Sequence, residues 1–168
     1  MKSNVRVRNA MPADVPTIAR MKLELAQEEG FPEVVRATEE DWMRDLFSPT
    51  ARFSTFVAES SDGMVGMLIY GEKYCPAWPD PIIFILDLYV DPAHRRHGVG
   101  TMLLQHVAGR AIRNKIPLME LNVLEDNPAR QLYSRAGFQH LPQCLTYVIA
   151  GPGLLQLAGT LTDFAGLF

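Results

Sequence analysis

A twenty-residue stretch organises the chain: Ile82-Ile-Phe-Ile-Leu-Asp-Leu-Tyr-Val-Asp-Pro-Ala-His-Arg-Arg-His-Gly-Val-Gly-Thr101. Its first part, residues 82–90, is apolar and rich in β-branched and aromatic residues, which predicts a buried strand. Asp91-Pro92 ends this strand, because proline has no amide hydrogen to give to a sheet. A basic turn follows, and Gly98 and Gly100 lead into a predicted helix of about four turns.

The basic turn and the helix start predict an anion-binding site. Free amides at a helix N-terminus carry about half a positive charge, and glycines let a phosphate approach the backbone. Arg95 and Arg96 add charge beside these amides. A dinucleotide fingerprint would need a third glycine where Leu103 stands, and no Gly-Lys-Ser/Thr ending follows, so neither common nucleotide motif fits. The alternative is an ordinary strand-to-helix connection with a solvated basic turn.

The composition predicts one globular domain in a reducing compartment. The chain has 168 residues, a net charge of −3 and two cysteines, Cys75 and Cys144. This length fits one domain, and the charge argues against a nucleic-acid partner. Two scattered cysteines argue against a disulfide framework. No apolar run reaches the roughly 20 residues that span a bilayer, and the start lacks a signal-peptide pattern. We therefore expect a cytoplasmic protein with no membrane partner.

The remaining segments alternate between strand and helix patterns. Strands are predicted over residues 5–8, 52–59, 64–70, 117–123 and 145–149. Helices are predicted from Asp14, as N-cap, to near Gly30, from Thr38 to near Ser48, after Gly98, and from Asn127 to Ala136. The apolar face of the first helix is expected to consist of Val15, Ile18, Met21 and Leu25. On the helix after Gly98, the core stripe is expected to contain Leu103, Val107 and Ala111, with Leu104, Ala108 and Ile112 beside it.

The C-terminal segment differs from the rest of the chain. Gly151-Pro-Gly153 precedes an apolar tail that runs from Leu154 to Phe168. Such a tail is too hydrophobic for a free linker, so we expect it to pack on the domain or on a second subunit. The predicted organisation is a domain over residues 1–150 and an extension over 151–168, in a homodimer.

Two motifs resemble those of the GNAT superfamily of N-acetyltransferases, which bind acetyl-coenzyme A. The first is Arg-x-x-Gly-x-Gly, from Arg95 to Gly100, after a strand that ends Leu-Tyr-Val. The second is Asn127-Pro-Ala-Arg-Gln-Leu-Tyr-Ser-Arg-Ala-Gly-Phe138. The resemblance implies an α/β (α+β) fold: a mixed, mostly antiparallel sheet of six to seven strands, with a splayed central parallel pair and about four helices.

The resemblance also implies which residues bind acetyl-coenzyme A. Amides near Leu88 and Val90 are expected to hold the thioester and pantetheine, and amides from Arg95 to Thr101 the pyrophosphate. The full expected set is Leu88, Tyr89, Val90, Arg95, Arg96, His97, Gly98, Val99, Gly100, Thr101, Asn122, Asn127 and Arg130. No metal ion is expected, and His94 and His97 are interpreted as loop residues or phosphate neighbours.

Acetyl transfer to an amine needs a proton acceptor for the amine and an acid for the departing thiolate. Tyr133 matches the tyrosine of the second motif, and a phenol with a pKa near 10 stays protonated at neutral pH. It is the predicted general acid; the alternative is a core tyrosine beside Leu132. Counting back from Tyr133, the motif's asparagine can also fall on Asp126. Asp87, a lone acid in an apolar strand, is predicted to accept the amine proton or bind the substrate, or else to accept backbone hydrogen bonds.

The N-terminal half resembles the diamine (spermidine/spermine) and thialysine acetyltransferase branch. That branch places an acidic residue near Glu29 and a Glu-Asp pair on the central strand, where this chain has Leu86-Asp87. The predicted substrate-binding residues are Glu28, Glu29 and Asp87, although an acidic pair at a helix end is also simply solvated. We expect an acetyl-coenzyme A-dependent enzyme that acetylates a small cationic primary amine by direct attack. The alternatives are a protein or peptide N-terminal acetyltransferase and a non-catalytic coenzyme A sensor.

Overall fold

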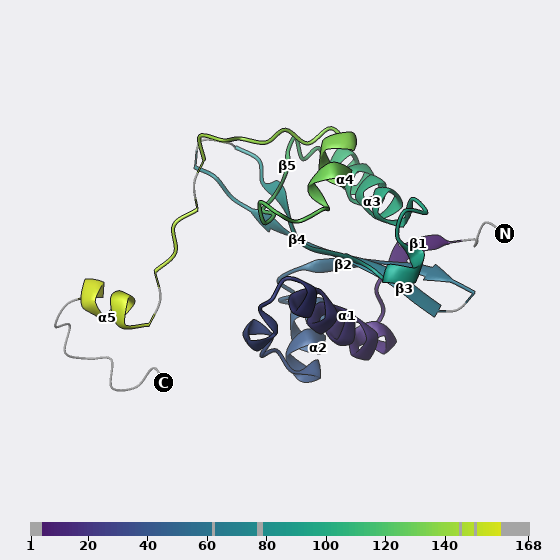
Figure 1. The fold of residues 1–168 in the computed structure, drawn as a ribbon, viewed down its shortest axis with the longest axis horizontal. Helices are drawn as coiled ribbons and strands as arrows, with labels where there is room; N and C mark the ends of the chain where they lie inside the picture. The colour runs from purple at the N-terminus through teal and green to yellow at the C-terminus, as the bar shows by residue number, and fades with distance from the viewer. Residues whose placement is uncertain (1–4, 62, 77–78, 145, 150, 159–168) are drawn as a thin grey trace. The chain divides into compact units, whose positions relative to one another are not determined.

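The computed structural model describes residues 5–61, 63–76, 79–144, 146–149 and 151–158. The chain divides into two compact units, Met1–Phe138 and Gln139–Phe168. The first unit contains β1 (Arg6–Asn9), α1 (Val15–Glu28), α2 (Glu39–Phe47), β2 (Ser54–Ser60), β3 (Gly63–Lys73), β4 (Ile82–Val90), α3 (Val99–Arg113), β5 (Met119–Leu121) and α4 (Arg130–Arg135) (Figure 1). The second contains α5 (Pro152–Ala158). None of these described helices is both long and apolar enough to cross a membrane.

The first unit is built on one mixed sheet. Its five strands lie in the order β1-β2-β3-β4-β5, antiparallel from β1 to β4 and parallel between β4 and β5. The predicted class of sheet is confirmed, with five strands in the described residues instead of six or seven. Residues 146–149 were expected in a closing strand but lie in no strand, and Leu145 is outside the described residues. An apolar run forms a strand only where its backbone finds a partner, which the local pattern does not reveal.

A β-bulge at Leu86 changes which face of the sheet each side chain of β4 meets. Asp87 pairs with Ile69 and Ile85 with Tyr70, so Leu86 is the extra residue. Ile83 and Ile85 lie in the core beneath α3, and after the bulge Leu88 and Val90 pack against the same core. Tyr89 instead joins the core beneath α1. The bulge therefore also turns Asp87 towards the α1 face.

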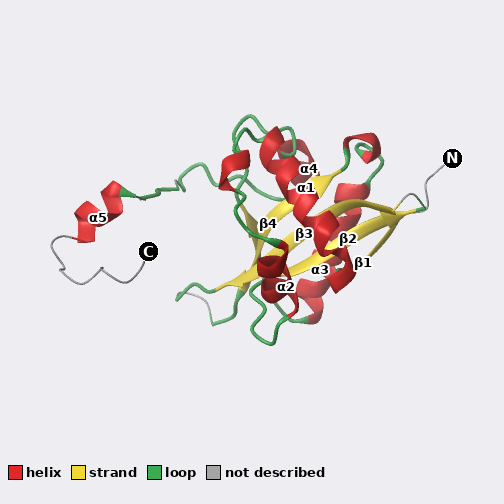
Figure 2. Cartoon of the chain, turned by 90° about the horizontal axis from the view of Figure 1, so that it is seen from below, coloured by secondary structure: helices red, strands yellow, loops and turns green. Residues whose placement is uncertain are grey.

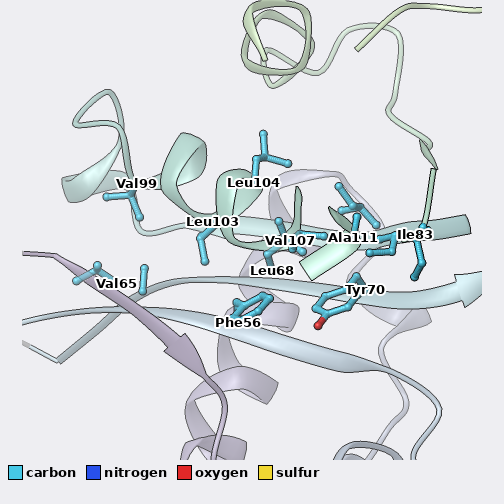
Figure 3. Close-up of a cluster of buried hydrophobic side chains, with 13 residues drawn as sticks. Phe56, Val65, Leu68, Tyr70, Ile83, Val99, Leu103, Leu104, Val107 and Ala111 are labelled. Atoms are coloured by element: carbon cyan, nitrogen blue, oxygen red, sulfur yellow. The ribbon is translucent and has the colours of Figure 1, made fainter. Parts of the chain in front are cut away.

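The sheet is covered by helices on both faces (Figure 1; Figure 2). The core under α3 includes Phe56, Leu68, Tyr70, Leu103, Leu104, Val107 and Ala111 (Figure 3). The core under α1 and α2 includes Val15, Ile18, Met21, Leu25, Trp42, Leu46 and Met67. The predicted apolar face of α1 is thus confirmed, as is the main stripe of α3.

One part of the predicted α3 stripe is wrong. Leu104 is buried, but Ile112 is 78% exposed. Each four-residue step turns about 40° beyond a full helical turn, so the row from Leu104 leaves the buried face by its third member.

The helix caps agree with the sequence in one case and differ in two. Thr38 and Asp41 form the predicted capping box at the start of α2. Asp14 is the N-cap residue of α1, as predicted, but its carboxylate accepts no hydrogen bond from that helix; it accepts hydrogen bonds from the Met11 amide at 2.7 Å and from Arg8 Nη1 at 2.6 Å. Helix α4 begins at Arg130, three residues after the predicted cap, because Asn127 Oδ1 accepts a bond from the Ala129 amide and forms a turn there instead.

The Arg8–Asp14 pair predicts a pH-dependent contribution to stability. Hydrogen bonds from Arg8 lower the pKa of Asp14, so the contribution is present above the unfolded-state value of 3.8 and is lost as the pH falls through the folded-state value. Asp14→Asn should lower the free energy of unfolding by about 2 kcal/mol at neutral pH, measured by urea denaturation. Glu120→Gln, in the exposed pair with Lys73, should cost about 0.5 kcal/mol or less. Equal losses in the two variants would contradict this assignment.

Candidate active site

The parallel strands β4 and β5 part after three residue pairs. Ile83 pairs with Met119, Phe84 with Glu120 and Ile85 with Leu121, while β4 continues to Val90. Beyond Ile85, the edge of β4 that faces β5 therefore lacks a strand partner in the part of the chain that the structure describes. Asn122 follows β5 directly and is exposed. The predicted splay is present, and it offers backbone donors and acceptors to a ligand.

The N-terminus of α3 lies beside the end of β4 and has no side-chain cap. Its N-cap, Gly98, has φ 86°, and a Cβ added there would meet no atom within 4 Å. Arg96 also has a positive φ, of 63°. Because the first amides of a helix have no partner within it, they can serve an anion here.

Gly100 also leaves room for a neighbouring helix. A Cβ at Gly100 would lie 2.9 Å from Leu132 Cδ2, so the missing side chain lets α4 pack closely on α3. The two glycines of the motif thus have different structural roles. Gly98 permits the left-handed turn, and Gly100 brings α4, with Tyr133, close to the helix start.

Arg95 binds protein groups. Its Nη2 lies 2.6 Å from Glu28 Oε1, its Nε donates to the Val90 carbonyl at 2.7 Å, and its guanidinium lies 5.6 Å from the centre of the Tyr89 ring. The side chain therefore fastens the basic loop to the end of α1, and Glu28 is engaged with it. Arg96 is exposed and has no ion pair among the described residues. Arg96 is thus the loop's uncompensated guanidinium.

Asp87 and Lys22 form an ion pair that sequence reasoning missed. Lys22 Nζ donates to Asp87 Oδ1 at 2.6 Å, and their side chains are only 24% and 13% exposed. A signal was available, because Lys22 stands four residues from both Ile18 and Ala26, within the buried face of α1. A lysine in an apolar helix row needs a partner, and the bulge at Leu86 supplies Asp87.

Glu29 lies in the same electrostatic environment. Burial raises the pKa of this carboxyl, the charges of Asp87 and Glu28 raise it further, and Lys22 opposes them. Glu29 has no ion pair among the residues that the structure describes. It is therefore a carboxylate with a stronger tendency to take up a proton than an exposed glutamate.

Tyr133 lies on α4 and packs against the core on the α3 side of the sheet. Burial raises its pKa to about 12, and the charges of Glu29 and Asp87 act in the same direction. Its ring packs edge-on against Phe138, with ring centres 5.8 Å apart. Groups from α1, β4 and α4 thus influence one another where β4 and β5 part, and the hydroxyl of Tyr133 stays protonated there at physiological pH.

The other predicted site residues take varied positions. The side chains of Val99 and Tyr89 are buried in the core, and those of Leu88 and Val90 pack against it, so these four offer only their backbone to a ligand. His97 and Thr101 are exposed near the start of α3. Arg130 donates to the Glu125 carbonyl at 2.6 Å, and Asn127 shapes the turn before α4. Asn127 and Arg130 therefore support the start of α4 in this structure.

Residues 19–138 match the family described as Acetyltransferase (GNAT) family. The chain belongs to this family. Thialysine N-epsilon-acetyltransferase of Mus musculus is 31% identical over 169 residues, covering 94% of this chain and 99% of that protein. The chain is accordingly an acetyl-transferring enzyme of the GNAT type.

Solved GNAT-like structures share the fold. An integron cassette protein from the mobile metagenome of V. cholerae has a TM-score of 0.75 at 22% identity, covering 95% of this chain and 99% of its own. The acetyltransferase AAC(6')-Iy, in complex with the bisubstrate analogue CoA-S-monomethyl-acetylneamine, has a TM-score of 0.70 at 15% identity, covering 89% and 100%. These likenesses confirm the mixed α/β architecture.

Glu29 should reduce stability at neutral pH. Its folded-state pKa is raised above the ordinary 4.5, so ionisation favours the unfolded chain, and this penalty disappears as the pH falls through the raised value to 4.5. Glu29→Gln should therefore raise Tm near neutral pH, with a gain that vanishes near pH 4.5, measured by thermal unfolding. Glu33→Gln, at an exposed carboxylate after α1, is the matched control and should leave Tm unchanged. A Glu29→Gln variant with a lower Tm at neutral pH would contradict this interpretation.

Proposed function

We propose that this enzyme transfers an acetyl group from acetyl-coenzyme A to a small, cationic primary amine by direct attack. The observation that carries the proposal is that the charges of Glu29 and Asp87 both raise the pKa of Tyr133, so acid–base groups from the end of α1, from β4 and from α4 lie within electrostatic range of one another. A carboxylate and a protonated phenol there supply the base and the acid of an aminolysis reaction. The similarity to a thialysine N-epsilon-acetyltransferase supports an amine as acceptor.

The residues present fit acetyl-coenzyme A. The uncapped start of α3 and the Arg96 guanidinium suit a pyrophosphate, and the open space at Gly98 leaves room for it. The edge of β4 from Leu88 to Val90, which has no strand partner among the described residues, suits the amides and carbonyl of the pantetheine and thioester, although the Val90 carbonyl already accepts from Arg95. When bound, acetyl-coenzyme A supplies the activated acetyl group.

The side chains have distinct roles on the amine side and the thiol side. Glu29, directly or through water, takes a proton from the amine, whose nitrogen forms a bond to the carbonyl carbon. The carbon–sulfur bond breaks, and the Tyr133 hydroxyl donates a proton to the sulfur as negative charge develops on it. The second proton that leaves the nitrogen then restores the Tyr133 hydroxyl, directly or through water. Asp87 was predicted to act as base, but its pairing with Lys22 makes it a weaker candidate than Glu29. Asp87 is accordingly proposed to border the acceptor site as the partner of Lys22, without a free charge of its own.

The assembly and compartment stay predictions. Described residues of the second unit expose large apolar side chains, with Leu154 52% and Leu157 73% exposed. Such side chains support the expectation that residues 151–168 pack on the domain or on a second copy. A homodimer in the cytoplasm is the proposed state.

Removing the Tyr133 hydroxyl should separate catalysis from binding. Tyr133→Phe is expected to lower kcat by about 10²-fold, because the departing sulfur loses its proton donor, with an unchanged Kd for acetyl-coenzyme A. Thiol release across an amine panel and calorimetric titration measure the two quantities. Tyr74→Phe, at a tyrosine that is 72% exposed, is the control. A Tyr133→Phe enzyme with wild-type turnover would exclude Tyr133 as the acid, and an absence of turnover in the wild type would favour a sensor.

The phosphate site predicts an effect of Arg96. Arg96→Ala should weaken acetyl-coenzyme A binding by about tenfold at low salt and reduce the salt dependence of Kd, because one guanidinium is lost beside the pyrophosphate. Arg113→Ala, in the last turn of α3, removes the same charge at the far end of the helix and should have little effect. Equal Kd values for the wild type and Arg96→Ala would contradict the assignment of this loop.

A further inference from the structure

The Lys22–Asp87 pair places a protein ammonium group in the proposed acceptor site. Lys22 comes from α1 and Asp87 from β4, 65 residues apart in sequence, and their charged atoms lie 2.6 Å apart. Both side chains are largely withdrawn from solvent. The pair is therefore held more firmly than an exposed ion pair, whose partners separate readily.

Local structure fixes both partners. Lys22 projects from the buried face of α1, between Ile18 and Ala26, which are 0% and 2% exposed. Asp87 turns to that face because the bulge at Leu86 shifts the alternation of β4. The backbone of α1 and the bulge in β4 bring the two side chains together, so the ion pair does not depend on the rotamers of two exposed side chains.

The charges around the site can be counted group by group. Glu28 is neutralised by Arg95, and Asp87 by Lys22. Tyr133 is uncharged at physiological pH because burial raises its pKa to about 12. Glu29 is left as the carboxylate without an ion pair among the described residues of this group. The net charge of the acceptor site is therefore −1 when Glu29 is ionised, where Asp87 and Glu29 alone would give −2.

We propose that Lys22 is a specificity-determining residue that restricts the acceptor to amines with one cationic group. The inference rests on the proposed function and narrows its substrate class. An amine with one ammonium group balances the single charge of Glu29. A diamine or polyamine brings a second ammonium group, which meets the Lys22 ammonium at Asp87 instead of a free carboxylate. Lys22 thus disfavours polycations by occupying the carboxylate that would receive their second charge.

A purely structural role for Lys22 makes a different prediction. If the pair only stabilises α1 against the sheet, its loss should weaken binding of all amines in parallel. If it sets specificity, its loss should change the ratio between a diamine and a monoamine. The ratio of affinities is therefore the informative quantity, because effects common to both amines cancel in it.

The test compares 1-aminobutane with 1,4-diaminobutane, which differ by one ammonium group. Binding of each to the full-length protein saturated with coenzyme A is measured by calorimetry, and kcat/KM is measured where turnover occurs. Lys22→Met should raise the preference for the diamine by about tenfold or more, whereas Lys22→Arg should keep the wild-type ratio because it retains the charge. Arg20→Met, on the same helix and 51% exposed, is the matched control.

A double variant distinguishes charge from disruption. Lys22→Met combined with Asp87→Asn restores a net charge of −1 and should return the ratio to that of the wild type, although the ion pair is absent. Thermal unfolding and coenzyme A binding establish that each variant is folded, and Lys22→Gln replaces Lys22→Met if the latter is not. An unchanged ratio in Lys22→Met, or a double variant that keeps the altered ratio, would overturn the proposal. Because the ratio is measured by binding, a protein that binds these amines without turnover would refute the proposed function and still test Lys22.

Discussion

The candidate site depends on the short length over which β5 pairs with β4. Three residue pairs join these parallel strands, and among the described residues β4 then continues to Val90 paired with β3 alone. If the pairing continued, the backbone groups of residues 88–90 on that edge would be used within the sheet, and α1 and α4 would be separated by a closed layer. In the same unit, the charge of Glu29, at the end of α1, raises the pKa of Tyr133, on α4.

Contacts on both faces of the sheet fix the elements around the point where β4 and β5 part. The bulge at Leu86 turns Asp87 towards α1 while Leu88 and Val90 continue the core under α3. Gly100 lets Leu132 approach, which sets α4 close to the start of α3. Arg95 ties the basic loop to Glu28 at the end of α1. Partly buried charges such as Glu29 reduce stability at neutral pH, which is a common compromise at catalytic sites.

The sequence predicted the features that follow from local pattern. The strand over residues 82–90 has the predicted bounds, and the buried face of α1 contains all four predicted residues. The parting of β4 and β5 came from the resemblance to a family, and the structure bears it out. The ion pairs of Lys22 and Arg95 could not be predicted in the same way, because each joins segments more than 60 residues apart, with separations of 65 and 67. The contact of Gly100 with Leu132 could not be predicted either, because it also joins distant segments.

The most direct test of this account is a crystal structure of the protein with acetyl-coenzyme A. The pyrophosphate should lie within hydrogen-bonding distance of the amides of residues 96–101, and the thioester along the edge of β4 that faces β5, near Leu88 and Val90. Beyond Ile85, β4 and β5 should also remain apart. Acetyl-coenzyme A bound away from this opening, or strands paired through Val90 when it is bound, would contradict the account.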